Sequence, residues 1–123
     1  MLTDTTFWID IFHERARRQS GPASRFLASH RALRFQVSIV TWEVIAEGFE
    51  SVDDVTLLLR GIKVLLLPQQ VAWEASRIAR EMAGQRLGEN DNWIAATARV
   101  WGLNLVTRDS AFSRVRRLRI TTY

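Results

Sequence analysis

Four acidic residues are spaced so that a folded chain can bring them to one place. Asp4, Glu43 and Asp109 each follow closely on a short apolar segment, and Asp91 begins a helical pattern that leads into another such segment. If the apolar segments are strands of a parallel sheet, the four acids lie at the edge where the strands end. Open α/β sheets bind their ligands at that edge. Carboxylates that converge there repel one another unless a cation neutralises them.

The cation that suits such a cluster is Mg²⁺, with Mn²⁺ as an alternative, because hard ions prefer carboxylate oxygen and retained water. The chain has no cysteine, and its histidines lie away from the four acids, so we do not expect a zinc site. Each acid also has an ordinary structural interpretation. Asp4 and Asp109 can accept hydrogen bonds from turn amides, and Asp91 and Glu43 can stabilise the first turn of a helix. The four acids together favour the metal site.

The elements that must position these acids alternate along the chain. Apolar, partly β-branched segments predict strands at residues 1–3, 35–40, 63–67, 103–106 and 118–121. Helical spacing and start signals predict helices near residues 7–12, 22–33, 41–49, 71–82 and 90–101, with another starting at Ser51. Strands that alternate with helices imply a parallel sheet with right-handed crossovers. Because the strands are apolar on both faces, helices must cover both. We therefore predict a three-layer α/β domain with a central parallel sheet.

The bulk composition fits a single domain over residues 1–123. Hydrophobic residues make up 47% of the chain, and neither a linker nor a repeat interrupts it. The longest apolar run is far too short to span a bilayer, and acids interrupt the N-terminal segment. We expect a cytoplasmic protein without a signal peptide or a membrane anchor. The net charge of +4 is compatible with nucleic-acid binding and equally with an ordinary solvated surface.

Several segments resemble one family, the PIN-domain nucleases. Residues 2–6, Leu-Thr-Asp-Thr-Thr, are similar to the family's opening strand and its Asp-Thr-Ser/Thr signature. Residues 90–98 closely resemble its Asn-Asp-x-x-Ile-Ala-Ala segment, and residues 102–109 followed by Phe112 resemble the segment after it. Residues 38–42 before Glu43, then Gly48, resemble the second-strand signature. The likeness covers nearly the whole chain in the right order, and length and composition are similar to the VapC toxins of toxin–antitoxin pairs.

This resemblance implies a PIN-like fold and Mg²⁺-dependent hydrolysis of RNA phosphodiester bonds. Asp4 and Asp91 would then be direct metal ligands, and Glu43 and Asp109 would complete the catalytic and metal site. The resemblance also implies a VapB-like antitoxin as partner, a homodimer, and an RNA substrate whose identity the motifs do not encode. A catalytically weak PIN-fold module that binds RNA or protein is the alternative function, which metal-dependent cleavage by the purified chain separates from the first.

The chain departs from the family pattern at the second acid. Family members place it three residues after the threonine of the second-strand signature, and that position here is Val44. Glu43 comes one residue early and Glu47 one helical turn later. We predict that Thr41 ends a strand, that Glu43 begins the next helix, and that Glu43 is the metal-site acid. Glu47 is then a groove residue or a surface charge.

Other residues support either a functional or a structural interpretation. Thr6 and Thr107 can orient the acids or can be turn residues, and Arg108 can contact RNA or simply be exposed. The basic residues of the segment 114–119 can bind phosphates or solvate a sheet edge. Tryptophans occur on the predicted helices, and we expect them in the core: Trp8, Trp73, Trp93 and Trp101. A receiver domain is excluded, because Asp4 stands alone after the first strand and the only lysine is Lys63.

Overall fold

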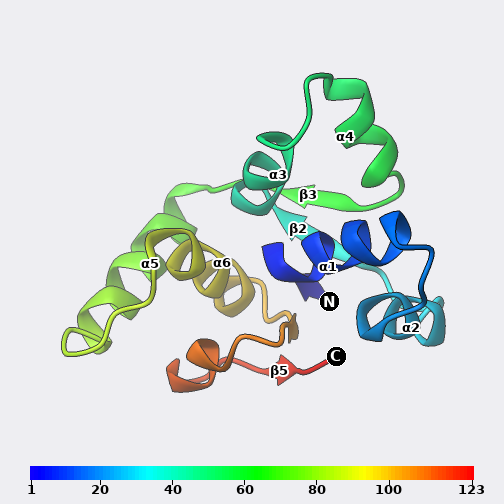
Figure 1. Cartoon of the computed structure of the whole chain (residues 1–123). Helices are drawn as coiled ribbons and strands as arrows, with labels where there is room; N and C mark the ends of the chain where they lie inside the picture. Colours follow the sequence, from blue (N-terminus) through cyan, green and yellow to red (C-terminus); the bar gives the residue numbers. More distant parts are fainter.

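The computed structural model describes residues 1–123 and has three layers, with a parallel sheet between two groups of helices (Figure 1). The strands are β1 (Leu2–Thr3), β2 (Gln36–Ser38), β3 (Lys63–Leu65), β4 (Leu105–Val106) and β5 (Ile120–Thr121). The helices are α1 (Thr5–Ala16), α2 (Pro22–Ser29), α3 (Ile39–Ala46), α4 (Val52–Leu58), α5 (Gln69–Glu81), α6 (Glu89–Val100) and the 3₁₀ helix η1 (Ser110–Arg114). The predicted fold class is confirmed. None of the helices combines the length and the apolar character needed to cross a bilayer.

All five strands run parallel, in the order β3-β2-β1-β4-β5. Thr3 is level with Val37 of β2 and with Val106 of β4. The residues that follow these three, which are Asp4, Ser38 and Thr107, therefore lie at the same edge of the sheet, with Ser38 as the last residue of β2. This register places the β1 acid beside the end of β4.

Each face of the sheet has its own apolar core, because alternate side chains of a strand point to opposite faces. Leu2 and Leu105 pack with residues of α5, α6 and η1, whereas Val37 and Val106 pack with residues of α1 to α4. Helix α6 is central to the first core. Its residues from Ile94 to Ala98 are all buried, so the helix that carries Asp91 is firmly seated.

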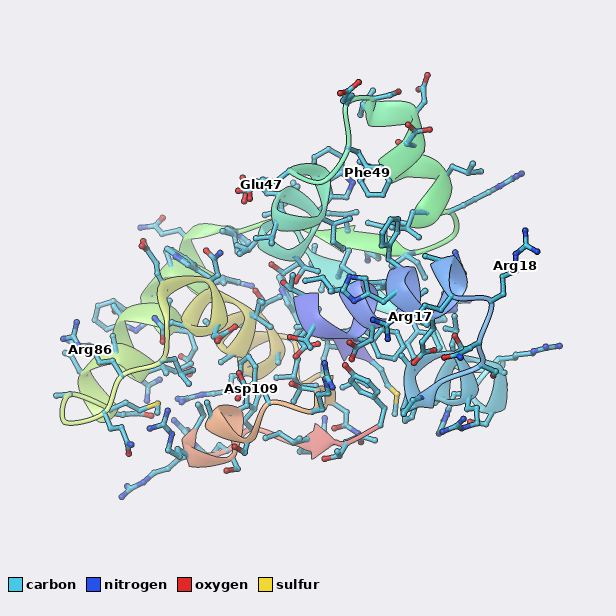
Figure 2. The ribbon with its side chains drawn as sticks, in the orientation of Figure 1. Arg17, Arg18, Glu47, Phe49, Arg86 and Asp109 are labelled. Atoms are coloured by element: carbon cyan, nitrogen blue, oxygen red, sulfur yellow. The ribbon has the colours of Figure 1, made fainter.

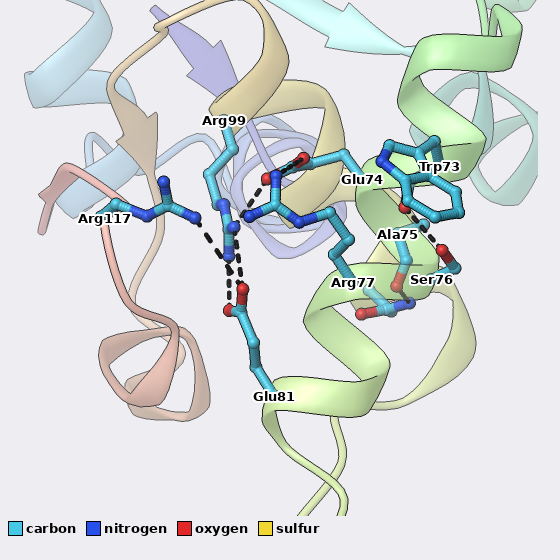
Figure 3. A network of polar contacts seen from close by, with 9 residues as sticks. Trp73, Glu74, Ala75, Ser76, Arg77, Glu81, Arg99 and Arg117 are labelled. Atoms are coloured by element: carbon cyan, nitrogen blue, oxygen red, sulfur yellow. Dashed lines mark hydrogen bonds and ion pairs between the residues drawn. The ribbon is translucent and has the colours of Figure 1, made fainter.

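An ion-pair cluster fastens α6 to α5 (Figure 3). The Arg99 guanidinium donates to Glu74 at 2.6 Å and to Glu81 at 2.9 Å, and its side chain is only 3% exposed. Arg77 reaches Glu74 at 3.3 Å, and Arg117, from the basic segment 114–119, lies 3.8 Å from Glu81. Arg117 therefore has an acidic partner on α5, Glu81, as a structural interpretation of the basic segment allows.

The boundary between β2 and α3 differs from the prediction. A strand over residues 35–40 and a helix starting at Thr41 were expected, but β2 ends at Ser38 and α3 starts at Ile39. The Ser38 hydroxyl accepts a hydrogen bond from the Val40 amide at 2.9 Å and so caps the helix. Thr41 consequently lies inside the first turn of α3, not at a strand end.

Two of the predicted core tryptophans are on the surface. Trp8 is buried at 2% exposure, but Trp73 is 60% exposed and Trp101 is 45% exposed. The Arg80 guanidinium lies over Trp73, 5.2 Å from the centre of the indole ring. This cation–π contact is favourable for an aromatic ring at the surface. Trp101 follows the last residue of α6, where Gly102 turns the backbone with a φ of 60° and ends the helix.

Candidate active site

Asp4 is the buried centre of the candidate site. It is the N-cap of α1, where its Oδ1 accepts a hydrogen bond from the Phe7 amide at 2.8 Å. Its Oδ2 accepts a hydrogen bond from the Thr107 hydroxyl. Only 2% of Asp4 is exposed. A carboxylate so deeply placed between two strands is held in one orientation by the start of α1 and the end of β4.

Thr107 connects Asp4 to Asp109. The Thr107 hydroxyl donates to Asp4 and accepts a hydrogen bond from the Asp109 amide at 3.0 Å. Asp109 in turn caps η1, since its Oδ1 accepts a hydrogen bond from the Ala111 amide at 2.8 Å. The capping role considered for Asp4 and Asp109 is therefore real, and it also fixes where both carboxylates point. Asp109 is exposed and so forms the rim of the site; Figure 2 labels it.

Asp91 lies in the first turn of α6. This helix belongs to the apolar core on the opposite face of the sheet from α1. The neighbouring Asn92 side chain donates to the Ala75 carbonyl of α5 at 3.0 Å, which anchors this end of the helix. Asp91 is half-buried. Its position also suits the positive end of the helix dipole, so the structural interpretation and the functional one are compatible.

The three aspartates act on one another electrostatically. Burial raises the pKa of Asp4 most, the bonds from Thr107 and Phe7 oppose this shift, and the charges of Asp91 and Asp109 add to it, so that the pKa is about 6. Burial and then the charge of Asp109 raise the pKa of Asp91. No ion pair of the chain includes any of the three. The site is thus an acidic cluster without a protein cation to balance it.

Glu43 and Glu47 are both exposed on α3 and lie outside this set. The charges that act on Asp4 are those of Asp91 and Asp109, and neither glutamate is among them. Glu43 lines a separate hollow of about 300 Å³ together with Glu89 and Asn90 at the start of α6. Figure 2 shows the Glu47 carboxylate projecting outward from α3. Glu43 is therefore the glutamate nearer to the helix of Asp91, and its role as the second acid stays a prediction.

Residues beside the cluster are held by side-chain hydrogen bonds to different partners. Thr107 orients an acid, which is one of the two roles predicted for it. Thr5, for which the sequence predicts no role, donates from its hydroxyl to Thr41 at 3.3 Å and ties α1 to α3, while the role of Thr6 stays a prediction. Arg108 pairs with Asp10 at 2.9 Å. The Tyr123 hydroxyl donates to the same Asp10 at 2.7 Å. Burial, and then the bond to Asp10, raise the pKa of Tyr123, so the phenol stays protonated.

The donor chemistry of the cluster fits a hard divalent cation. No group of three or more histidine, cysteine, aspartate or glutamate side chains is placed to hold a metal ion by itself. Mg²⁺ does not require such a cage, because it keeps several waters and is usually bound through one or two carboxylates and substrate phosphates. The pKa of Asp4 is raised first by burial and also by its two acidic neighbours, which is an arrangement that a cation stabilises. Asp4 and Asp91, with Asp109 on the rim, therefore fit Mg²⁺ held largely through water.

Comparisons with known proteins agree on one family. The PIN domain model matches residues 1–118. VapBC2 from Rickettsia felis, solved with a DNA fragment from its promoter, is similar over 99% of this chain and 97% of that one, with a TM-score of 0.79 and 15% identity. DNA-bound VapBC from Salmonella typhimurium is similar over 98% of this chain and 96% of that one, with a TM-score of 0.70 and 25% identity. Mycobacterium tuberculosis VapC20, a sarcin-ricin loop cleaving toxin, is similar over 96% of this chain and 98% of that one, with a TM-score of 0.62 and 18% identity. No curated protein matches the chain significantly.

Proposed function

Since the chain belongs to the PIN domain family, we propose that it is an Mg²⁺-dependent ribonuclease and the toxin of a VapBC-type toxin–antitoxin pair. The observation that carries this proposal is the buried Asp4 carboxylate, which faces the charges of Asp91 and Asp109 with no basic partner. Such a cluster repels an anionic phosphodiester unless a cation is bound. The activity of the M. tuberculosis neighbour, a loop-cleaving toxin, supports RNA as the substrate class.

Asp4 and Asp91 would hold the Mg²⁺, which polarises the phosphoryl group and lowers the pKa of water in such sites. Asp4 must lose its proton when the cation binds, because only the carboxylate is a ligand. Thr107 keeps the Asp4 carboxylate in place and positions the backbone of Asp109. Asp109 adds negative charge at the exposed rim, where the scissile phosphate would arrive.

The test of this function is cleavage of RNA by the purified chain. We expect cleavage with Mg²⁺, loss of cleavage with a chelator, and recovery when Mg²⁺ is restored in excess. A chain that binds RNA but cuts none with either Mg²⁺ or Mn²⁺ would be the catalytically weak module instead. Cleavage that persists in the chelator would point to a contaminating nuclease or to a metal-independent mechanism, and either would remove the support for the metal site.

The position of the second acid can be decided by two matched variants. We expect Glu43→Gln to lower the cleavage rate by about tenfold, in the range seen for residues that support metal ligands. Glu47→Gln should change it by less than about twofold, because that carboxylate projects away from α3. Rates measured at saturating Mg²⁺ check this. A large loss in Glu47→Gln alone would transfer the role to Glu47, and two small effects would mean that the aspartates suffice.

The proposed partner is an antitoxin that covers an apolar groove between α1, α3 and α4. The groove has a volume of about 230 Å³ and is lined mainly by hydrophobic side chains, among them Ile9, Phe12, Phe49 and Leu58. Ile9 is 41% exposed and Phe12 is 48% exposed. Structural neighbours solved as VapBC support an antitoxin as partner. The exposed apolar groove is the surface that we expect it to bury, and a basic side chain from it would suit the acidic cluster.

Co-expression with the small open reading frame beside the toxin gene tests the partner. We expect the two proteins to co-purify, the toxin to be a homodimer by light scattering, and growth arrest to be relieved. A toxin that stays alone on the column and still arrests growth would mean that the chain acts without an antitoxin.

A further inference from the structure

A polar cavity of about 520 Å³ opens beside the acidic cluster. One of its walls is a single face of α1 and the turn after it, since Asp10, His13, Glu14 and Arg17 recur at helical spacing and all line it. Most of its other lining residues are also polar or charged. A cavity of this volume is large enough for a small ligand, and this lining selects a polar or charged one.

One lining residue, Arg108, relates the cavity to the candidate active site along the chain. Arg108 lines it and stands in the chain between Thr107 and Asp109, both of which are bonded into the cluster. Arg108 and Tyr123 are held against the opposite wall, because both donate to Asp10, at 2.9 Å and 2.7 Å. An RNA strand that runs from the acidic cluster past Arg108 would therefore enter a cavity whose walls are held in place by these hydrogen bonds.

One basic side chain of the cavity, that of Arg17, is not paired with an acidic residue. Asp10 pairs with Arg108. Glu14 accepts hydrogen bonds from the Ala23 and Ser24 amides at 3.0 Å and 2.8 Å, at the start of α2, so its charge is balanced by a helix terminus. Arg17 takes part in no ion pair of the chain. An anion that enters the cavity meets an uncompensated guanidinium.

We propose that this cavity is a phosphate-binding subsite for the RNA strand next to the cleaved bond, with Arg17 as its principal contact. The inference rests on the proposed ribonuclease function. Arg17 is the C-cap of α1, at the opposite end of that helix from Asp4 and about 20 Å from it along the helix axis, so it would meet a phosphate a few nucleotides from the scissile one. The guanidinium suits this role, because it binds phosphate oxygens through paired N–H groups. An acidic protein segment is the competing occupant.

The neighbouring Arg18 provides a matched control. It has the same side chain, adjoins Arg17 in the chain, and does not line the cavity. Figure 2 shows Arg18 projecting outward, on the far side from Asp109, whereas Arg17 lies closer to the centre of the molecule. The two arginines contribute equally to net charge, so any difference between Arg17→Gln and Arg18→Gln reports position.

The experiment measures binding of a short single-stranded oligoribonucleotide by both variants in an Asp4→Asn background, which prevents cleavage. We expect Arg17→Gln to weaken binding about tenfold, the loss of one charged contact, and to flatten the slope of log K against log salt by about 0.7. Arg18→Gln should change neither. In the otherwise native protein, Arg17→Gln should raise KM and leave kcat nearly unchanged.

Equal effects of the two variants would overturn the proposal, as would an Asp4→Asn parent that binds no RNA. Loss of antitoxin binding in Arg17→Gln, with RNA binding intact, would assign the cavity to an acidic protein segment and reject the RNA subsite. These outcomes are distinct from failure of the ribonuclease function, which is judged by cleavage in the native protein with Mg²⁺. Thermal melts of both variants confirm that they are folded.

Discussion

Replacing Asp4 with asparagine is expected to reduce Mg²⁺-dependent RNA cleavage by at least about 100-fold, beyond the range seen when only a supporting residue of a metal site is changed. The substitution keeps the size of the side chain and an oxygen that accepts from the Phe7 amide, while its NH2 group would donate to the Thr107 hydroxyl, which donates to Asp4 in the native protein. It removes the charge that a cation requires. Asp91→Asn should have a similar effect on activity, because Asp91 is the other expected direct ligand.

The same variant should be more stable than the native protein when no metal is present. Burial raises the pKa of Asp4 from 3.8 to about 6, so the folded state holds this proton more tightly than the unfolded state. The contribution of Asp4 to stability is therefore complete below about pH 4 and is lost as the pH rises through about 6. At pH 8 the variant is expected to gain up to about 3 kcal/mol.

Denaturant melts at pH 4 and pH 8 in a chelator check this difference. Asp54→Asn is the control, because Asp54 is an exposed acid in the first turn of α4. It should alter neither cleavage nor the dependence of stability on pH by a comparable amount. An Asp4→Asn protein that is folded and fully active would contradict the proposed site. One that loses activity but shows the native dependence of stability on pH would contradict the burial argument.

Replacing Arg99 with alanine is expected to lower the free energy of unfolding by about 3 kcal/mol. The side chain is 3% exposed, and its removal takes from Glu74 and Glu81 the cation that they share. For a chain of this size the midpoint of thermal unfolding should fall by on the order of 10 °C. The bond to Arg99 lowers the pKa of Glu81. The stability from this pair is present at neutral pH and is lost as Glu81 takes up a proton in acid.

Arg77→Ala is the matched control for this prediction. Arg77 also bonds to Glu74, at 3.3 Å, but its side chain is 40% exposed and lies one turn away on the same helix. Such pairs contribute less than about 1 kcal/mol. Thermal melts at neutral pH, repeated in acid, compare the two variants. Equal small effects would mean that Arg99 does not fasten α6, and that the position of Asp91 depends on the apolar core alone.

The sequence predicts the parallel sheet and the positions of its acids because these follow from local rules. Short apolar strands alternate with helical patterns, and parallel strands end at one edge. Asp4 and Asp109 can therefore be assigned to a common edge from the order of strands and helices alone. The register that places Asp4 level with Thr107 adds the hydrogen bond that joins β1 to β4.

What the sequence does not predict depends on competition or on distant contacts. Ile39 and Val40 favour a strand by type, but the Ser38 cap starts a helix at Ile39, which moves Thr41 and Glu43 inside α3. Tyr123 meets Asp10 across 113 positions of the chain, a pairing that no local pattern encodes. The cavity beside the acidic cluster has the same origin, because its walls come together only in the folded chain.

The central claim is that the aspartate cluster is a metal-dependent nuclease site, and one paired measurement tests it most directly. Mn²⁺ binding and RNA cleavage are followed on the same samples of the native protein, Asp4→Asn and Asp91→Asn as the metal concentration rises. The account predicts that cleavage by the native protein rises in step with bound metal, and that both variants lose metal binding and cleavage together. Cleavage by either variant at the native rate, or by a native protein with no metal bound, would contradict it.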